Sequence, residues 1–346
     1  MLQIAAKATP TKWVKIHHHM KALQYIEKGR PEIVDLPTPE PGDGQVLLKI
    51  EGVATCPHWD LHIMDGISMV PGGTVEYPYT PGQPGHEAMG EVVAVGPNSE
   101  PFTVGMKAAL WQDQAGAPQG CYAEYVLADI GNLLEIPGNL APQEIASLEL
   151  AMCVQVSFDQ ILNVKPIEGS RFAVAGLGPA GLVAIQLAKA YGANEVIAFD
   201  PTESRRKLAS HLGADRALDP TDDNAFPHNR FSPEAIDLAV DCTGLKVSVE
   251  YLMHRTVDVV ALFGVLRDNV DFGFTHWCRG LHLVGYGSHN RAAARTALAH
   301  IVEGRLKLDP LITTTLPLER YAEGVELLRS QDAIKVCFTP EDSPSE

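Results

Sequence analysis

The chain has 346 residues, of which 45% are hydrophobic and 20% charged, and its net charge is −16. A single core stops growing at about 250–300 residues, so this length favours two domains in a soluble globular protein. The acidic excess argues against a nucleic-acid partner, because phosphate backbones bind basic surfaces. No apolar run approaches the roughly 20 residues of a membrane span, so we expect no membrane partner either.

Six cysteines lie far apart in the sequence, at Cys56, Cys121, Cys153, Cys242, Cys278 and Cys337. Their spacing is that of free thiols rather than of a disulfide scaffold or a zinc ribbon, which favours a reducing, cytoplasmic location. Residues 1–19 lack periodicity and end in three consecutive histidines. We interpret them as a leader or a tag outside the fold, with a natural metal-binding histidine tract as the alternative.

The chain from Met20 to about Pro137 predicts a β-rich domain. Short apolar runs alternate with Pro and Gly, and the clearest are KALQY (21–25), QVLLKIEGVA (45–54), GEVVAVG (90–96) and CYAEYVLA (121–128). Runs of this kind, bounded by turn residues, predict strands joined by loops.

Beyond Ala141 the sequence predicts alternating helices and strands. Residues 144–164 carry apolar side chains at helical intervals, and RFAVAGLGPAG (171–181) predicts a buried strand that enters a glycine-rich turn. A helix and the strand 195–200 complete a βαβ unit. Further strands are expected at 235–244, 259–265, 281–287 and 334–340, and further helices at 291–306 and 319–330. The pattern predicts an α/β protein whose second domain is a doubly wound parallel sheet.

A glycine-rich dinucleotide motif follows the first strand of this second domain. Its residues include Gly176, Gly178, Pro179, Ala180 and Gly181. Gly176 permits the tight turn, Gly178 lets a pyrophosphate approach the backbone, and Gly181 allows the helix to pack closely on the strand. The N-terminus of that helix then faces the phosphates. A βα turn without a cofactor is the alternative.

The end of the next strand bears on the choice of cofactor. Asp200 lies 19 residues after Gly181. A carboxylate at this position accepts hydrogen bonds from ribose hydroxyls and repels a 2′-phosphate, which favours NAD over NADP. Arg205 and Arg206 follow closely and could instead bind a phosphate, while Arg205 could also pack over the adenine.

Two later strand ends are expected along the cofactor. Thr243 follows one strand and is expected near the adenosine half, and Gly264 ends another and is expected near the nicotinamide. Each could equally be a simple strand-end turn.

The stretch TCPHWDLH (55–62) places one thiol, two imidazoles and one carboxylate within eight residues. His58 and His62 lie four apart, and on a helix such a pair can chelate zinc. Cys56 is a competing ligand, and a third interpretation is that nothing binds here. Thirty residues after Cys56, His86 and Glu87 stand side by side directly before a strand, which is a rigid position for metal ligation.

The order of several motifs resembles that of the zinc-dependent medium-chain alcohol and polyol dehydrogenases. The motifs are ATCPHWDLH, PGHEAMGEVVAVG, GCYAEYV, a cysteine on the helix before the nucleotide fold, and VAGLGPAGLVAIQLAKAYGA. The resemblance runs from Met20 to about Pro340. It implies a GroES-like β-rich catalytic domain formed by residues 20–145 and 290–346, with a Rossmann NAD-binding domain, residues 146–289, inserted between them.

The resemblance also implies one catalytic zinc ion in the cleft. By motif, Cys56 is the first ligand and His86 the second, and Glu87 is either a neighbouring acid or an occasional ligand. The third ligand is a cysteine or a glutamate among relatives. Cys153 lies closer than Glu149 to the family's usual separation from the glycine-rich motif, so we expect Cys153; its alternative is a small buried helix residue.

This donor set suits catalytic zinc. Two thiolates and one imidazole leave a fourth position open for the substrate, and sulfur and nitrogen donors favour zinc over iron or manganese. Bound zinc would lower the pKa of an alcohol hydroxyl, so that hydride could pass to the nicotinamide near neutral pH.

Two features depart from the pattern of the family. The segment between Met106 and Cys121 contains no cysteine, so we expect no second, structural zinc.

The second departure is an extra residue, because three residues rather than two separate the first ligand from Asp60. We assign Asp60 to orienting the His86 ring through a hydrogen bond, and His58 to proton relay, with a plain neighbouring or surface histidine as its alternative. Trp59 is expected to wall the substrate pocket or to pack the loop. His62 is expected near the cleft without a metal role.

The predicted function is a zinc-dependent, NAD-linked dehydrogenase that oxidises an alcohol, polyol or sugar hydroxyl to the carbonyl. The partner is then a small-molecule alcohol, and we expect a homodimer or homotetramer. A zinc-free quinone or enone reductase of the same superfamily is one alternative, and a non-catalytic nucleotide-sensing protein is another.

Overall fold

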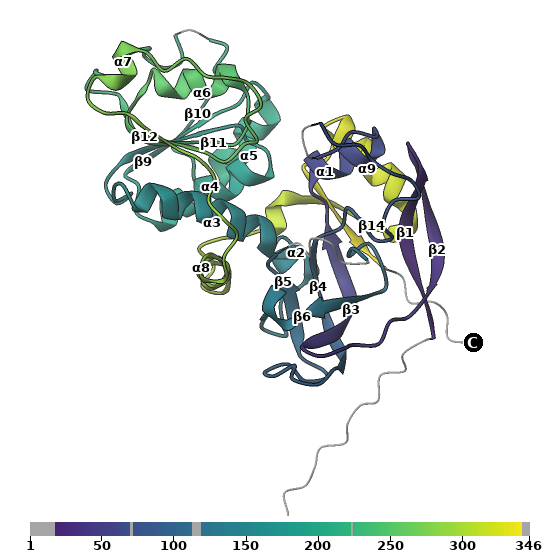
Figure 1. Ribbon diagram of the computed structural model, residues 1–346. Helices are drawn as coiled ribbons and strands as arrows, with labels where there is room; N and C mark the ends of the chain where they lie inside the picture. The colour runs from purple at the N-terminus through teal and green to yellow at the C-terminus, as the bar shows by residue number, and fades with distance from the viewer. Residues whose placement is uncertain (1–17, 70–71, 113–118, 223, 341–346) are drawn as a thin grey trace, which may run out of the picture.

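The computed structural model describes residues 18–69, 72–112, 119–222 and 224–340. Figure 1 shows two lobes, a β-rich one that contains both the first and the last strands of the chain, and a second one in which a sheet lies between helices. The middle of the sequence therefore forms one lobe and its two ends form the other.

The β-rich lobe is built on a seven-stranded sheet. Its strands are β3 (Gln45–Ala54), β4 (Glu87–Val95), β5 (Lys107–Leu110), β6 (Tyr125–Asp129), β7 (Leu133–Glu135), β14 (Ile312–Pro317) and β15 (Lys335–Thr339). The order is β14-β15-β3-β4-β5-β7, with β6 also paired to β3. A separate antiparallel hairpin consists of β1 (His19–Glu27) and β2 (Arg30–Pro37).

The C-terminal segment completes this sheet after the chain leaves the second lobe. Strand β15 pairs antiparallel with β3 through Cys337 and Ala54, and parallel with β14. The helix α9 (Tyr321–Arg329) packs against α1 (Pro57–Met64), which follows β3. Residues from the two ends of the chain thus meet beside the stretch that contains Cys56.

The second lobe is a six-stranded sheet in which every pair of strands is parallel. Its strands are β8 (Arg171–Ala175), β9 (Glu195–Phe199), β10 (Arg216–Leu218), β11 (Ile236–Asp241), β12 (Thr256–Leu262) and β13 (His282–Val284). Its helices are α4 (Pro179–Ala190), α5 (Glu203–His211), α6 (Lys246–Met253) and α7 (Phe274–Trp277). The order β10-β9-β8-β11-β12-β13 reverses direction between β8 and β11, the point at which ligands bind in such sheets. The predicted fold class is confirmed.

The helix α3 (Leu148–Leu162) joins the two lobes, after the short helix α2 (Pro142–Ile145). One hydrophobic cluster extends from Met89 of β4 through Phe158 of α3 to Val174 of β8. The stretch Pro142–Leu162 is long and apolar enough to span a membrane, but 78% of its apolar window is buried inside the protein. Its apolar character is therefore explained by its place in the core.

The residue boundaries predicted for the two domains stay a prediction, but two elements bear on them. Strand β1 begins at His19, one residue before the start that the sequence suggested, and residues 1–17 lie outside the described part of the chain. The helix α8 (Arg291–Val302) packs against α3. The remaining elements are three short 3₁₀ turns at Ile130–Asn132, Asp309–Leu311 and Leu318–Arg320.

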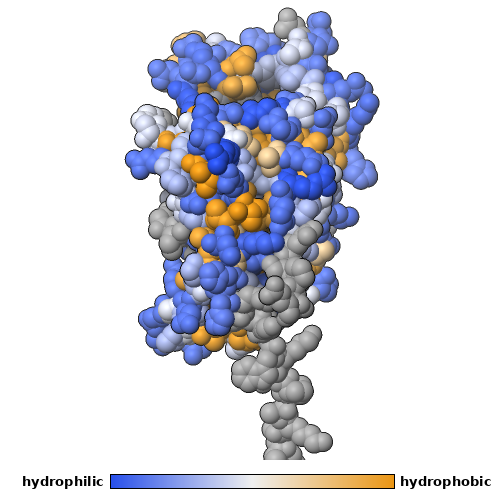
Figure 2. Space-filling view, turned by 90° about the vertical axis from the view of Figure 1, so that its right-hand side faces the viewer, coloured by the Kyte–Doolittle hydropathy of each residue, from blue (hydrophilic) through white to orange (hydrophobic). Residues whose placement is uncertain are grey.

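The surface agrees with the composition of the chain. Figure 2 shows a predominantly hydrophilic face on which hydrophobic side chains form small, separate patches. A net charge of −16 on such a surface favours solubility and disfavours polyanionic partners.

Candidate metal and cofactor site

Cys56 and His86 meet at one end of the β-rich sheet because of strand register. Cys56 caps α1 directly after β3, and His86 directly precedes β4. The two strands are antiparallel, with Ala54 opposite Glu87, so residues just beyond these positions become neighbours. The ligand atoms of Cys56, His86 and Glu87 all lie within 4.8 Å of one another.

The His86 ring is buried and its orientation is fixed by the backbone. Its Nδ1 lies 2.7 Å from the carbonyl oxygen of Pro84, which accepts a hydrogen bond from the protonated Nδ1 and so leaves Nε2 to face a metal. Burial opposes protonation of the ring, but the hydrogen bond to Cys56 and the charge of Glu149 outweigh it and raise the pKa of His86 well above its usual value. The Trp59 ring lies against the imidazole, with centroids 4.7 Å apart.

The hydrogen bond predicted from Asp60 to His86 is wrong, since Pro84 occupies that place. Asp60 is fully buried, and its Oδ1 accepts hydrogen bonds from Tyr122 (2.8 Å) and Tyr321 (2.6 Å). Burial raises the pKa of Asp60 to about 6. Its side chain thus ties α1 to two distant tyrosines, and it acts on His86 only through its charge.

Glu87 is held by a buried lysine. The Lys335 Nζ of β15 donates to both carboxylate oxygens of Glu87, at 2.7 and 2.6 Å, and neither side chain is more than 1% exposed. Of the two roles offered for Glu87, this pairing favours the acid behind the metal over the ligand. A buried ion pair of this kind is tolerated only while both partners are present, because removal of one leaves the other charge buried and unpaired.

A second group of donors comes from the helix α3 and from the loop after β13. Glu149, Cys153 and His289 have ligand atoms that all lie within 4.8 Å of one another. The Cys153 Sγ lies 3.0 Å from Glu149 Oε1 and 3.4 Å from His289 Nε2. Burial, followed by the charge of Glu149, raises the pKa of the Cys153 thiol well above its usual value.

The two groups approach each other where Glu149 Oε2 lies 3.8 Å from His86 Nε2. The sulfur, imidazole and carboxylate groups in these two mostly buried clusters are donor types that zinc binds. The residues present therefore fit a zinc ion. His289 was missed by the sequence-based prediction, because a histidine after a strand end carries no spacing signal that relates it to Cys153.

The glycine-rich motif lies where the prediction placed it, between β8 and α4. Gly176 has a φ of 85°, and Gly178 is the residue that caps α4. A Cβ added to Gly181 would come within 1.9 Å of the Gly176 carbonyl oxygen, so no side chain fits there. The turn, the helix N-terminus and the close packing that a pyrophosphate site needs are all present.

Thr243 and Gly264 lie at neighbouring strand ends beside this motif. A Cβ on Gly176 would come within 2.6 Å of Thr243 Cγ2, and one on Gly264 within 2.0 Å of the Gly244 nitrogen. The loops after β8, β11 and β12 are therefore in close backbone contact, and they form one edge along which an extended ligand could lie.

Asp200 is buried at the end of β9. Its two carboxylate oxygens accept hydrogen bonds from the backbone nitrogens of Leu177 and Thr202, both at 2.8 Å. The Arg205 guanidinium lies 3.9 Å from the same carboxylate, whereas Arg206 donates to the Asp200 backbone carbonyl. Asp200 thus anchors the glycine-rich turn, and Arg205 is the cation nearest to its carboxylate.

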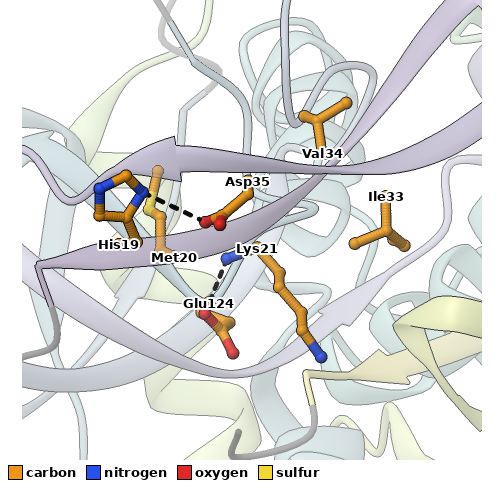
Figure 3. Close-up of a pocket in the computed structure, with 7 residues that line it drawn as sticks. All are labelled: His19, Met20, Lys21, Ile33, Val34, Asp35 and Glu124. Atoms are coloured by element: carbon orange, nitrogen blue, oxygen red, sulfur yellow. Dashed lines mark hydrogen bonds and ion pairs between the residues drawn. The ribbon is translucent and has the colours of Figure 1, made fainter.

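A cavity of about 330 Å³ lies elsewhere, beside the β1–β2 hairpin. Figure 3 shows the residues that line it. Among them, Asp35 lies in ion-pair distance of His19, and Glu124 accepts a hydrogen bond from the Lys21 backbone nitrogen. None of the predicted ligands or cofactor-binding residues lines it, so it does not belong to the site described above.

Two family models match the chain. One is the alcohol dehydrogenase GroES-like domain, over residues 42–138, and the other is the zinc-binding dehydrogenase domain, over residues 179–303. Together they cover most of the sequence. The chain belongs to the zinc-dependent medium-chain alcohol dehydrogenase family.

Individual relatives of this dehydrogenase agree with the family. An L-threonine 3-dehydrogenase from Pyrococcus furiosus is 29% identical and covers 90% of this chain and 97% of its own. The solved structure of 2R,3R-butanediol dehydrogenase from Bacillus subtilis has a TM-score of 0.81 at 23% identity and covers 93% and 100%. A zinc-binding dehydrogenase from Sinorhizobium meliloti, solved bound to NADP, has a TM-score of 0.78 at 24% identity and covers 94% and 100%.

The family assignment confirms the predicted enzyme class, an oxidoreductase acting on a CH–OH group, and the predicted cofactors zinc and a nicotinamide dinucleotide. The individual residue roles stay predictions. His58 and His62 face each other on α1 of this dehydrogenase, with ring centroids 4.1 Å apart. Partial burial, together with the charge of Arg267 and the neighbouring ring, lowers the pKa of His58.

Proposed function

We propose that this enzyme oxidises the hydroxyl of a small alcohol, polyol or sugar to the carbonyl, with NAD as the hydride acceptor and zinc as the metal. The observation that carries the proposal is the meeting of Cys56 and His86 with Glu149 and Cys153, which join at the 3.8 Å contact between His86 and Glu149. Two thiols, an imidazole and a carboxylate in adjoining, mostly buried clusters are a donor set that zinc binds.

Zinc held by Cys56, His86 and Cys153 would polarise a substrate hydroxyl and lower its pKa. Backbone groups and one aromatic side chain of the protein position the other parts of the site. The Pro84 carbonyl fixes the His86 ring, the Trp59 ring packs against it at a tilt, and the turn at Gly176 with the N-terminus of α4 would hold the pyrophosphate. Hydride transfer itself belongs to the nicotinamide.

We propose NAD rather than NADP as the physiological cofactor. The Asp200 carboxylate at the end of β9 supports NAD, because a 2′-phosphate beside it would be repelled. Arg205, 3.9 Å from that carboxylate, and the NADP bound to the Sinorhizobium meliloti relative keep NADP as the alternative. Initial rates with each cofactor at equal concentration decide between them.

The named activities of the relatives guide the choice of substrates. One acts on L-threonine and another on 2R,3R-butanediol, so both compounds belong in a panel with primary, aryl and sugar alcohols. The panel is run with the zinc-loaded enzyme and after removal of the metal by a chelator. Turnover that requires zinc supports the proposal. Enone or quinone reduction that survives chelation supports the zinc-free reductase, and nucleotide binding without any turnover supports the sensing protein.

We further propose a cytoplasmic homodimer or homotetramer. Six free cysteines support a reducing compartment. Phe274 and Trp277, on α7 of the second lobe, are 74% and 69% exposed, an unusual exposure for aromatic side chains that supports a contact with another chain. Light scattering coupled to gel filtration would give the mass, and a monomer at micromolar concentration would contradict this proposal.

A further inference from the structure

The indole N–H of Trp59 is a buried donor that finds no hydrogen-bond acceptor in the described part of the chain. Trp111 shows the usual arrangement, since its side chain is also largely buried and its Nε1 donates to the Gly131 carbonyl oxygen at 2.9 Å. A buried N–H that makes no hydrogen bond costs free energy, which is why buried indole nitrogens usually have a partner. An acceptor that enters with a ligand would remove this cost at Trp59.

Trp59 lies beside the candidate metal site. It belongs to the first turn of α1, and its ring packs against that of His86, with centroids 4.7 Å apart and an angle of 47° between the rings. The imidazole is itself held by the Pro84 carbonyl oxygen, 2.7 Å from Nδ1. A small molecule bound next to His86 would therefore come close to the indole.

The chemistry of the indole limits what it can do for such a molecule. Its Nε1–H is a hydrogen-bond donor and never an acceptor, so it cannot take the proton that a reacting hydroxyl must lose. Its use is the recognition of an acceptor oxygen that keeps its lone pairs throughout the reaction. The nearest such oxygen in an alcohol substrate is a second hydroxyl, on the carbon next to the reacting one.

The acids near the indole favour a neutral acceptor over a carboxylate. Asp60, the next residue of α1, is fully buried and accepts hydrogen bonds from two tyrosine hydroxyls. Glu149 lies 3.8 Å from His86, the ring against which the indole packs. A substrate carboxylate would add a further negative charge beside these acids, whereas a hydroxyl oxygen accepts the same hydrogen bond without charge.

We propose that Trp59 selects substrates with a second hydroxyl on the carbon next to the reacting one, by donating a hydrogen bond from Nε1 to that second oxygen. The inference rests on the proposed function, since it assumes that the reacting hydroxyl lies at the candidate metal site. It narrows the substrate class to vicinal diols, including polyols and sugars. A simple alcohol in the same pocket leaves the indole N–H without an acceptor, and sites of this kind discriminate against such a substrate.

The test compares two substrates that differ by one hydroxyl on the same carbon chain, 2R,3R-butanediol and (R)-2-butanol. The values of kcat and KM are measured with NAD for the zinc-loaded parent enzyme and two variants. Trp59→Phe keeps an aromatic ring but removes the N–H. Trp111→Phe is the matched control, because the N–H that it removes is bonded inside the protein.

We expect the parent kcat/KM to be at least about tenfold higher for the diol, and Trp59→Phe to lower that value by about tenfold while changing the value for 2-butanol by less than about twofold. Trp111→Phe should keep the parent ratio of the two substrates. Equal losses for both substrates in Trp59→Phe, or no loss for either, would overturn the inference, because the N–H would then not bond to the second hydroxyl.

Nuclear magnetic resonance of the indole N–H groups gives a readout that does not depend on turnover. The chain has four tryptophans, and the signal that is missing in Trp59→Phe belongs to Trp59. In the zinc-loaded enzyme with NADH, which prevents oxidation, this signal should move downfield when the diol is added, because its proton gains an acceptor. It should not do so with 2-butanol. An equal response to both compounds, or none to either, would contradict the proposal.

Failure of the proposed function would look different, because the parent protein would then oxidise no alcohol in a zinc-dependent reaction. A zinc-dependent enzyme that is active on alcohols without preferring the diol would overturn the inference alone. Circular dichroism monitors folding. Should Trp59→Phe fail to fold, Trp59→Tyr replaces it, since the phenol places its donor at a different point and should also lower the ratio of diol to simple alcohol. An unchanged ratio in Trp59→Tyr would count against the indole N–H.

Discussion

The candidate metal site and the candidate nucleotide site of this enzyme are built in opposite ways. The candidate nucleotide site depends on one contiguous motif, from Gly176 to Gly181, which forms a turn between a strand and the helix that follows it. The candidate metal site gathers side chains from four distant segments, around Cys56, His86, Glu149 and His289. A site formed by one contiguous motif is damaged by substitutions within that motif. A site formed by residues from distant segments is also damaged by substitutions in the elements that hold those segments together.

Removal of one predicted metal-ligating side chain tests whether the two sites work independently. His86→Ala should abolish zinc binding and lower kcat/KM by more than about 1,000-fold, because the Lewis acid is lost. NAD binding, measured by fluorescence titration, should stay within about threefold of the parent value. Loss of NAD binding in the folded variant would show that the two regions are not independent.

A substitution outside the metal shell tests the distant support. Lys335→Met should lower the free energy of unfolding by about 3–5 kcal/mol, because Glu87 is left buried without its partner. Denaturant unfolding measures the change. The double variant with Glu87→Gln should recover part of the loss, and a double variant as unstable as the single one would contradict this explanation.

In the glycine-rich motif, the position most sensitive to substitution is Gly181. Gly181→Val should destabilise the second lobe by roughly 2–3 kcal/mol and abolish NAD binding, because the new Cβ would lie 1.9 Å from the Gly176 carbonyl oxygen. Zinc content, measured by elemental analysis of the folded fraction, should be preserved. Gly131→Val is the control, since nothing lies within 4 Å of a Cβ there.

The role assigned to His58 predicts a smaller effect on chemistry alone. His58→Ala should lower kcat by about 10- to 100-fold while zinc content stays unchanged, because a proton acceptor rather than a ligand is removed. His62→Ala, on the facing ring, is the comparison. If His58→Ala loses zinc, the assignment as a relay is wrong and the residue belongs to the metal shell.

The smallest effect is expected for cofactor choice. Asp200→Ala should shift the ratio of kcat/KM for NAD to that for NADP by about tenfold toward NADP, because the charge that repels a 2′-phosphate is gone. Leu177 and Thr202 also lose their hydrogen-bond acceptor, so Asp200→Asn serves as a control that keeps the side-chain shape. An unchanged ratio in both variants would assign NAD preference to other residues.

The sequence by itself determined the parts that depend on short-range patterns. Apolar periodicity and the placement of Gly176, Gly178 and Gly181 after a strand were sufficient for the parallel-sheet lobe, because backbone sterics tie this motif to one local shape. The motif order led to Cys56, His86 and Cys153 through resemblance, and their role as ligands stays a prediction; in the structure His86 and Cys153 lie in two donor clusters that approach each other at the contact between His86 and Glu149.

Only the tertiary structure decided the contacts that join distant segments. The backbone carbonyl of Pro84 holds His86 where Asp60 was expected, Lys335 pairs with Glu87 across 248 residues, and His289 approaches Cys153 across 136. Such contacts depend on strand register, on the return of the C-terminal strands to the first sheet, and on the course of a loop. None of these leaves a periodic or spaced signal in the chain, because their cause is the packing of whole elements rather than the sequence on either side of the residue.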